Sequence, residues 1–159
     1  MEKKETGKWL KVIIMAAALI SLVLTGIIAP LLGKEALITN PELSYLYWPS
    51  LIFIWITAIP LFVSLYLFYL ISKEIMRDNP FHEKNSARLK LVSRLALLES
   101  GLYLIALITL MFLGAFHISL LLIIIFVMFI GLAMAVITAI LAHLVDKARR
   151  IEAENELTI

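Results

Sequence analysis

Long stretches without a charged residue constrain this chain more than any other feature. Residues 12–33 and 43–72 contain no Asp, Glu, Lys or Arg, and residues 95–145 contain only Glu99. An ionised side chain at the centre of a bilayer costs several kcal/mol, and about 20 apolar residues are enough for a helix to cross the hydrocarbon core. The pattern therefore predicts a membrane protein.

The third stretch must contain two crossings. Its 46 uncharged residues, 100–145, would form a helix of about 69 Å at 1.5 Å per residue, about twice the thickness of the hydrocarbon. A turn is expected at 114–119, where Gly114 can end one helix and Ser119 can cap the next. The predicted fold is all-α: one polytopic membrane domain, a bundle of four transmembrane helices at about 9–32, 49–72, 86–114 and 119–146.

The overall composition excludes the other common classes of protein. Of the 159 residues, 62% are hydrophobic and 16% are charged, whereas soluble domains are about half apolar and a quarter charged. The chain has no cysteine, which excludes disulfides and thiolate metal sites. We find no catalytic, dinucleotide or phosphate-binding motif, and three isolated histidines make no metal site, so we expect no enzyme activity, cofactor or metal.

The positive charges predict an orientation. Lys and Arg number four in residues 1–11, six in 72–94 and three in 143–159, against one in 33–48. Basic loops stay in the cytoplasm. We therefore expect a multi-pass protein of the plasma membrane with both termini cytoplasmic, a cytoplasmic loop at 73–94 and a cytoplasmic tail at 147–159.

Glu99 is the only Asp, Glu, Lys or Arg within the three apolar stretches, and it is therefore a candidate functional residue. It follows Arg94 by five residues, about 7.5 Å along a helix, so we expect it near the headgroups, solvated or paired with a basic neighbour. In the functional alternative, His143 of the antiparallel fourth helix lies at a similar depth, contacts Glu99 and shares a proton with it.

The cytoplasmic segments carry opposite charge. Residues 72–94 have a net charge of +3, and residues 143–159 have a net charge of −1. Ala87, Leu91 and Leu95 recur at helical spacing and predict that the third helix begins in the cytoplasm with this apolar face. The two segments either pack together, dock a partner, or remain solvated faces that contact anionic lipid.

Short motifs in these segments resemble a known family. The chain carries Asn79-Pro80-Phe81 followed by Glu83 and Asn85, and it ends in Glu154-Asn155-Glu156-Leu157-Thr158-Ile159. With the four-span layout, these motifs resemble the bacterial family called domain of unknown function 2975. The resemblance implies a small integral membrane protein, often encoded beside a helix-turn-helix regulator, and carries over no catalytic residue.

The leading hypothesis is a regulatory membrane protein that binds or sequesters that cytoplasmic regulator through its inner loop and tail. The candidate contact residues are Asn79, Pro80, Phe81, Arg88, Glu154, Asn155, Glu156 and Leu157. The alternative is a small transporter or channel, or an immunity-type protein, in which Glu99 matters instead. Self-association stays open. Direct nucleic acid binding is not expected, because an anionic membrane surface repels phosphates.

Overall fold

The computed structural model describes residues 3–77, 82–115 and 118–156, and the regular structure within these ranges is entirely helical. The elements are α1 (Lys3–Val23), the π-helical segment η1 (Leu24–Ile28), α2 (Ala29–Thr39), the 3-10 segment η2 (Pro41–Leu46), α3 (Tyr47–Met76), α4 (Glu83–Phe112) and α5 (Ile118–Glu156). Four continuous helical runs are long and apolar enough to span a membrane: Glu5–Thr39, Pro41–Met76, Glu83–Phe112 and Ile118–Glu154. The prediction of four such helices is confirmed.

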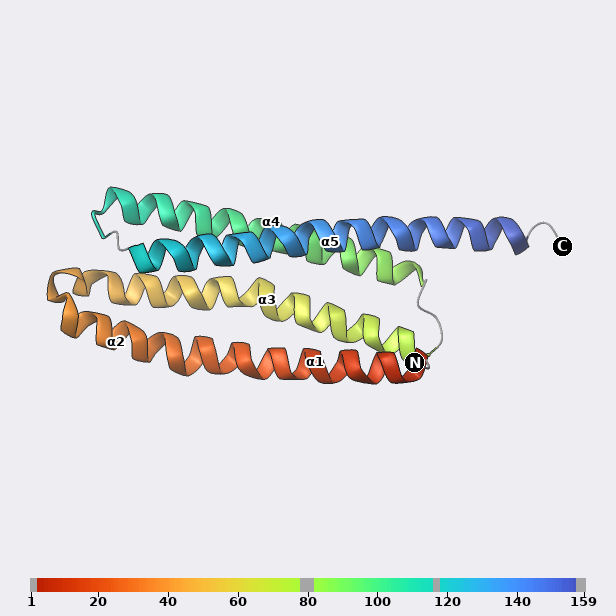
Figure 1. Cartoon of the computed structure of the whole chain (residues 1–159), viewed down its shortest axis with the longest axis horizontal. Helices are drawn as coiled ribbons and strands as arrows, with labels where there is room; N and C mark the ends of the chain where they lie inside the picture. Colours follow the sequence, from red (N-terminus) through yellow and green to blue (C-terminus); the bar gives the residue numbers. More distant parts are fainter. Residues whose placement is uncertain (1–2, 78–81, 116–117, 157–159) are drawn as a thin grey trace.

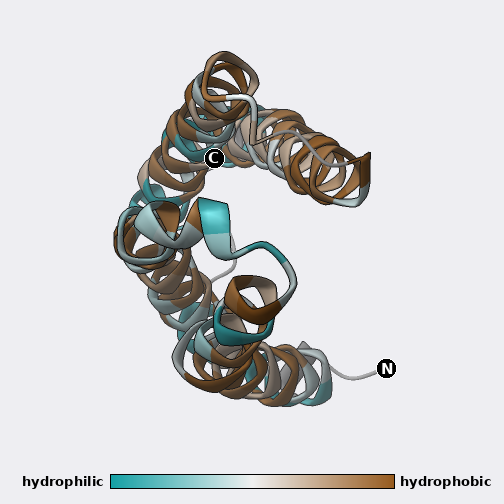
Figure 2. Cartoon of the chain, turned by 90° about the vertical axis from the view of Figure 1, so that its left-hand side faces the viewer, coloured by the Kyte–Doolittle hydropathy of each residue, from teal (hydrophilic) through white to brown (hydrophobic). Residues whose placement is uncertain are grey.

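The helices run antiparallel and lie in a row. α1 packs against α3, α3 against α4, and α4 most extensively against α5. Viewed end-on, they form an open arc (Figure 2), and within the described residues α1 has no close backbone approach to α4 or α5. The arrangement therefore has a concave side. Both described ends of the chain lie at one end of the molecule (Figure 1), which we call the basic end; the opposite, turn end holds η2 and residues 113–115.

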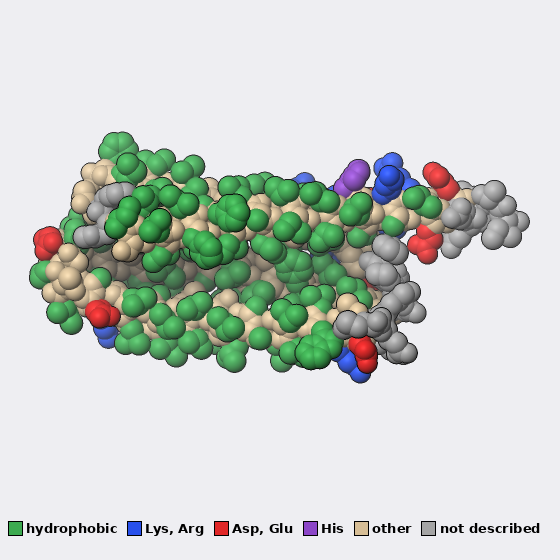
Figure 3. Space-filling model, viewed as in Figure 1, with side chains coloured by type: hydrophobic (Ala, Val, Ile, Leu, Met, Phe, Trp, Pro, Cys, Tyr) green, Lys and Arg blue, Asp and Glu red, His purple; other side chains and the backbone are tan. Residues whose placement is uncertain are grey.

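Hydrophobic side chains cover the middle of the molecule. Figure 3 shows them along all the visible helices, with charged side chains gathered at the two ends. Large apolar residues such as Leu19, Phe129 and Ile140 are more than half exposed. Soluble proteins rarely expose apolar surface on this scale, whereas a lipid environment stabilises it.

A regular set of serines joins α4 to α5. Ser86, Ser93 and Ser100 recur every seven residues and are buried. Their hydroxyls donate to backbone carbonyls of α5: Ser86 to Ala142 (3.3 Å), Ser93 to Ala135 (2.8 Å) and Ser100 to Met128 (3.5 Å). Ser100 also donates to Ala96 in its own helix, at 2.9 Å. Each step of seven along α4 matches a step of seven along α5, so these bonds define the register of the pair. We call this contact the serine seam.

Small residues on α5 make the serine seam possible. Ala135, Thr138 and Ala142 are almost completely buried, and a Cβ at Gly131 would overlap the Ser100 hydroxyl. Small side chains let two membrane helices approach closely enough for side chain to backbone hydrogen bonds. A search for paired glycines alone misses this interface.

The apolar face predicted for the start of α4 does not pack against the other helices. Ala87 and Leu91 are exposed, while Leu89 and Val92 are buried with the seam serines. The helix does begin well before the uncharged stretch, at Glu83, after His82 caps it by accepting from the Lys84 amide at 3.1 Å. Leu91 instead lies on the outer side of α4 and is 42% exposed.

The predicted turn between the last two helices is confirmed at its first residues. α4 ends at Phe112, and Gly114 follows with a φ of 66°. Glycine adopts this left-handed conformation without the steric cost that a Cβ imposes.

Candidate functional site

The structure describes only part of the predicted partner-binding surface. Asn79, Pro80, Phe81 and Leu157 lie outside the described residues, as do the side chains of Asn155 and Glu156. Two predicted residues are described. Arg88 is partly buried and donates to the Asn85 side chain oxygen at 2.8 Å, so it is bonded within its own helix, and Glu154 is exposed near the end of α5.

Ion pairs join the oppositely charged segments. Lys90 pairs with Asp146 at 2.7 Å, and Arg149 pairs with Glu83 at 3.6 Å. The start of α4 and the end of α5 therefore pack together, which was the first of the three arrangements expected for the two cytoplasmic segments. The pairs are exposed, and such contacts add little stability.

α5 extends past the described end of its neighbour. The serine seam places Glu83, the first residue of α4, level with about Val145 on α5. Residues 146–156 therefore continue for about 16 Å beyond that level at 1.5 Å per residue. Figure 1 shows this end of α5 projecting at the basic end. We call residues 146–156 the projecting helix.

Glu99 lies deeper than the headgroup level that its spacing from Arg94 suggested. Thr57 of α3 and Tyr103 of α4 are level with each other, because their hydroxyls are 3.4 Å apart. Because α3 and α4 are antiparallel, this pair places Tyr69 of α3 level with Leu91 of α4. Glu99 lies eight residues beyond Leu91, and therefore about 12 Å farther from the basic end than Tyr69. The Lys11 ammonium marks the basic boundary there, 5.6 Å from the centre of the Tyr69 ring.

The spacing of five residues between Arg94 and Glu99 underestimated the depth of Glu99, because Arg94 itself lies within the apolar layer. Its level is about three residues past that of Tyr69, and its side chain is exposed. Long arginine side chains reach water from a backbone position within the apolar layer. Glu99 is thus a partly buried carboxylate within the apolar zone.

The proposed contact between Glu99 and His143 is wrong. His143 follows Ala142, which is level with Ser86, whereas Glu99 precedes Ser100, which is level with Met128. The two side chains are therefore separated by about 14 residues, or about 21 Å along the helices. The prediction placed each residue by its distance from the nearest charged residue, Arg94 for Glu99 and Asp146 for His143. Asp146 pairs with Lys90 instead of Arg94, so Arg94 and Asp146 do not lie at the same depth.

Polar groups gather between α3 and α4 near Glu99. Thr57 is almost completely buried and also bonds the carbonyls of Phe53 (3.0 Å) and Ile54 (3.1 Å) in its own helix. The Tyr103 ring meets the Phe53 ring edge to face, with centroids 5.4 Å apart. Pro60 follows within α3 and cannot donate to the carbonyl four residues before it. We call Thr57, Tyr103 and Glu99 the polar cluster.

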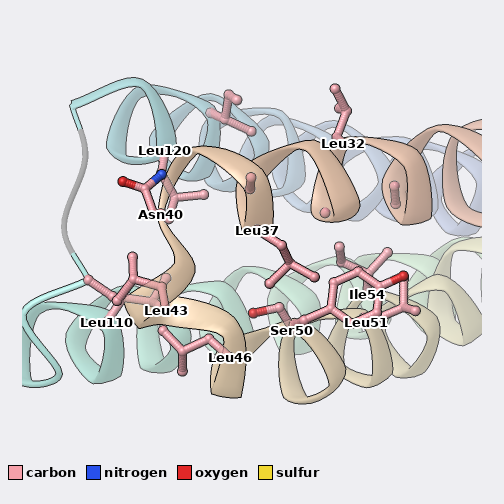
Figure 4. A pocket seen from close by; sticks show the side chains of 16 residues that line it. Leu32, Leu37, Asn40, Leu43, Leu46, Ser50, Leu51, Ile54, Leu110 and Leu120 are labelled. Atoms are coloured by element: carbon pink, nitrogen blue, oxygen red, sulfur yellow. The ribbon is translucent and has the colours of Figure 1, made fainter.

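An apolar groove opens on the concave side toward the turn end. Its volume is about 440 Å³, and α2, η2, α3, the end of α4 and the start of α5 contribute its lining. Figure 4 shows Leu37 pointing from α2 toward α3, with Leu51 and Ile54 on the facing side. The lining residues that carry a polar group are Asn40, Tyr47 and Ser50.

Sequence reasoning did not find the groove or the π-helical segment beside it. Trp55 donates from its indole nitrogen to the Thr25 carbonyl within η1, at 3.1 Å. Such π segments are frequent at functional sites. Neither feature has a local signal, because both depend on which residues of different helices meet. No group of three or more potential metal ligands exists among the described residues.

Comparison with known proteins gives one match. A family model described as "Protein of unknown function (DUF2975)" matches residues 31–159. The chain belongs to the DUF2975 family. The match includes α3, α4 and α5, and therefore the serine seam, the polar cluster and the projecting helix of this DUF2975 protein. No curated protein and no solved structure matches the chain.

Proposed function

We propose that this DUF2975 protein is a non-enzymatic, multi-pass protein of the plasma membrane that binds a cytoplasmic helix-turn-helix regulator at its basic end. Both termini are cytoplasmic in this proposal. Capture of the regulator at the membrane withholds it from DNA. The family resemblance suggests the partner, and the projecting helix is the observation that favours docking.

The projecting helix has the composition of a docking surface. Ile151 is 51% exposed, Arg150 directly precedes it, and Glu154 lies about one turn after it. An exposed apolar side chain supplies contact area to a partner, and the surrounding charges set orientation and association rate. The Lys90–Asp146 and Glu83–Arg149 pairs connect the base of this helix to α4.

Co-purification tests the proposal. The full chain is co-expressed with the adjacently encoded regulator, and the regulator recovered with the membrane protein is measured. Deletion of 152–159, Phe81→Ala and Ile151→Ala should each reduce recovery by tenfold or more. Tyr45→Ala, at an exposed position of the turn end, is the matched control and should leave recovery unchanged. Absence of binding by the intact chain would refute the proposal.

A small transporter, or an immunity-type protein, is the second candidate, and the depth of Glu99 favours it. Intramembrane carboxylates mark substrate or ion pathways in many membrane proteins. Under this function, Glu99→Gln abolishes the phenotype of the intact chain and deletion of 152–159 preserves it. Under regulator binding, the two results are reversed.

A further inference from the structure

The groove and the polar cluster lie along the same faces of α3 and α4. Ile54 lines the groove, and Thr57 follows it by one turn. On α4, Leu110 lines the groove, and Tyr103 lies seven residues before it on the same face. Glu99 lies one further turn toward the basic end on α4. Along α3 and α4, the groove is therefore followed toward the basic end by a hydroxyl pair and then by a carboxylate.

Glu99 has no counter-charge among the described residues. The ion pairs that the described chain forms engage other acids, namely Glu74, Glu83 and Asp146. Arg94 lies five residues away along α4, beyond one turn, and faces outward. A carboxylate in an apolar layer is stabilised by a cation that shares its surroundings. A hydrated metal ion or ammonium ion would lose its water in the groove at a high cost.

We propose that the groove and the polar cluster form a binding site for a lipophilic organic cation. The apolar body of the ligand occupies the groove, and its charge lies toward Glu99 and the ring of Tyr103. A delocalised or shielded cation is weakly hydrated, so the groove accepts it, and both the carboxylate and the aromatic face attract it. This site is independent of regulator binding.

The dimensions agree with a ligand of drug size. A volume of about 440 Å³ falls within the range of small-molecule sites. The level of Ile54 lies about seven residues from that of Glu99, or about 10 Å along the helices. A lipophilic cation of that size occupies the groove and brings its charge toward Glu99. A lipid acyl chain would also fill the groove, but it would leave Glu99 without a counter-charge.

Equilibrium binding of tetraphenylphosphonium to the purified full chain in detergent tests this site. Glu99→Gln should raise the dissociation constant at least tenfold, because the substitution removes the charge and keeps the shape. Glu42→Gln is the matched control: Glu42 is an exposed carboxylate of η2 beside the groove, and its loss should change the constant by less than twofold. Tetraphenylborate, an anion of the same shape, should bind at least tenfold more weakly than the cation.

Equal binding of tetraphenylphosphonium to the Glu99→Gln chain overturns the proposal, because the groove would then accept any apolar molecule. Equal binding of tetraphenylborate overturns it for the same reason. Leu110→Trp partly fills the groove and keeps Glu99, so it should weaken binding; unchanged binding contradicts the assigned place of the ligand. The melting temperature of each variant confirms folding. Regulator capture by Glu99→Gln should remain normal, so failure here is distinguishable from failure of the docking function.

Discussion

Gly131→Ala is the most direct perturbation of the interface between α4 and α5. The added Cβ overlaps the Ser100 hydroxyl and lies 3.4 Å from the Ala96 carbonyl oxygen. The backbone of α4 cannot move away without separating the helices, so Ser100 must leave its position. It then loses the bonds to Ala96 (2.9 Å) and Met128 (3.5 Å).

The expected loss of stability combines two effects. Overpacking of a tight interface costs about 1–3 kcal/mol, and each lost hydrogen bond between membrane helices costs about 0.6 kcal/mol on average. Alanine is a better helix former than glycine, which returns up to about 1 kcal/mol. The net free energy of unfolding should fall by about 2 kcal/mol, which is about a 30-fold change in the unfolding equilibrium.

Equilibrium unfolding by dodecyl sulfate in mixed micelles, followed by circular dichroism, measures this change. Gly101→Ala is the matched control on α4, because no atom lies within 4 Å of the position of its Cβ, and it should be neutral or slightly stabilising. Adding Ser100→Ala to Gly131→Ala should restore most of the loss, since the nearest remaining atom of residue 100 is its Cβ at 3.7 Å. Equal stability of Gly131→Ala and Gly101→Ala, or no recovery in the double variant, would refute the close-packed seam.

The same unfolding assay checks three further expectations. Gly114→Ala should cost about 1–2 kcal/mol, because φ is 66° there and a Cβ strains that conformation; Leu113→Ala on the neighbouring residue should cost less. Trp55→Phe removes the donor to the Thr25 carbonyl and should cost about 0.6 kcal/mol, with faster amide hydrogen exchange confined to the π-helical segment. Lys90→Ala breaks the ion pair to Asp146, in which the side chains of Lys90 and Asp146 are 54% and 31% exposed. It should lower the free energy of unfolding by less than about 1 kcal/mol, and the variant and the original chain should be equally stable at high salt.

The number and approximate places of the apolar spans follow from local solvation physics, although the helical runs extend beyond the predicted bounds, for example Pro41–Met76 against 49–72. A charged residue is costly in the hydrocarbon layer on any face of a helix. Uncharged stretches such as 12–33 and 43–72 therefore identify the spans without any knowledge of how the helices pack. Gly114 marks the turn for a similarly local reason, since its φ favours glycine over other residues. These features were therefore accessible from the sequence.

The faces and depths of the helices depend on pairs of elements and were not accessible in the same way. Apolar periodicity identified Leu91 as part of an apolar face but could not show whether that face packs on protein, because in a lipid environment bulky apolar side chains gain as much from lipid as from protein. Ser86, Ser93 and Ser100 carried the informative signal, a seven-residue repeat of small polar residues. The depth of Glu99 depends on the register of α4 against α3, which the Thr57–Tyr103 contact reveals.

The same register separates the two proposed sites. Glu99 is level with about Phe129 on α5, whereas the projecting helix begins at Asp146, about 17 residues or 25 Å farther along the helix. A substitution at Glu99 can reach the projecting helix only by shifting α4 against α5, and three serine bonds oppose that shift. A one-residue slip would turn all three hydroxyls away from their carbonyls together. Loss of regulator capture in Glu99→Gln would therefore mean that the helices have a second register, in which bound cation and docking surface are coupled.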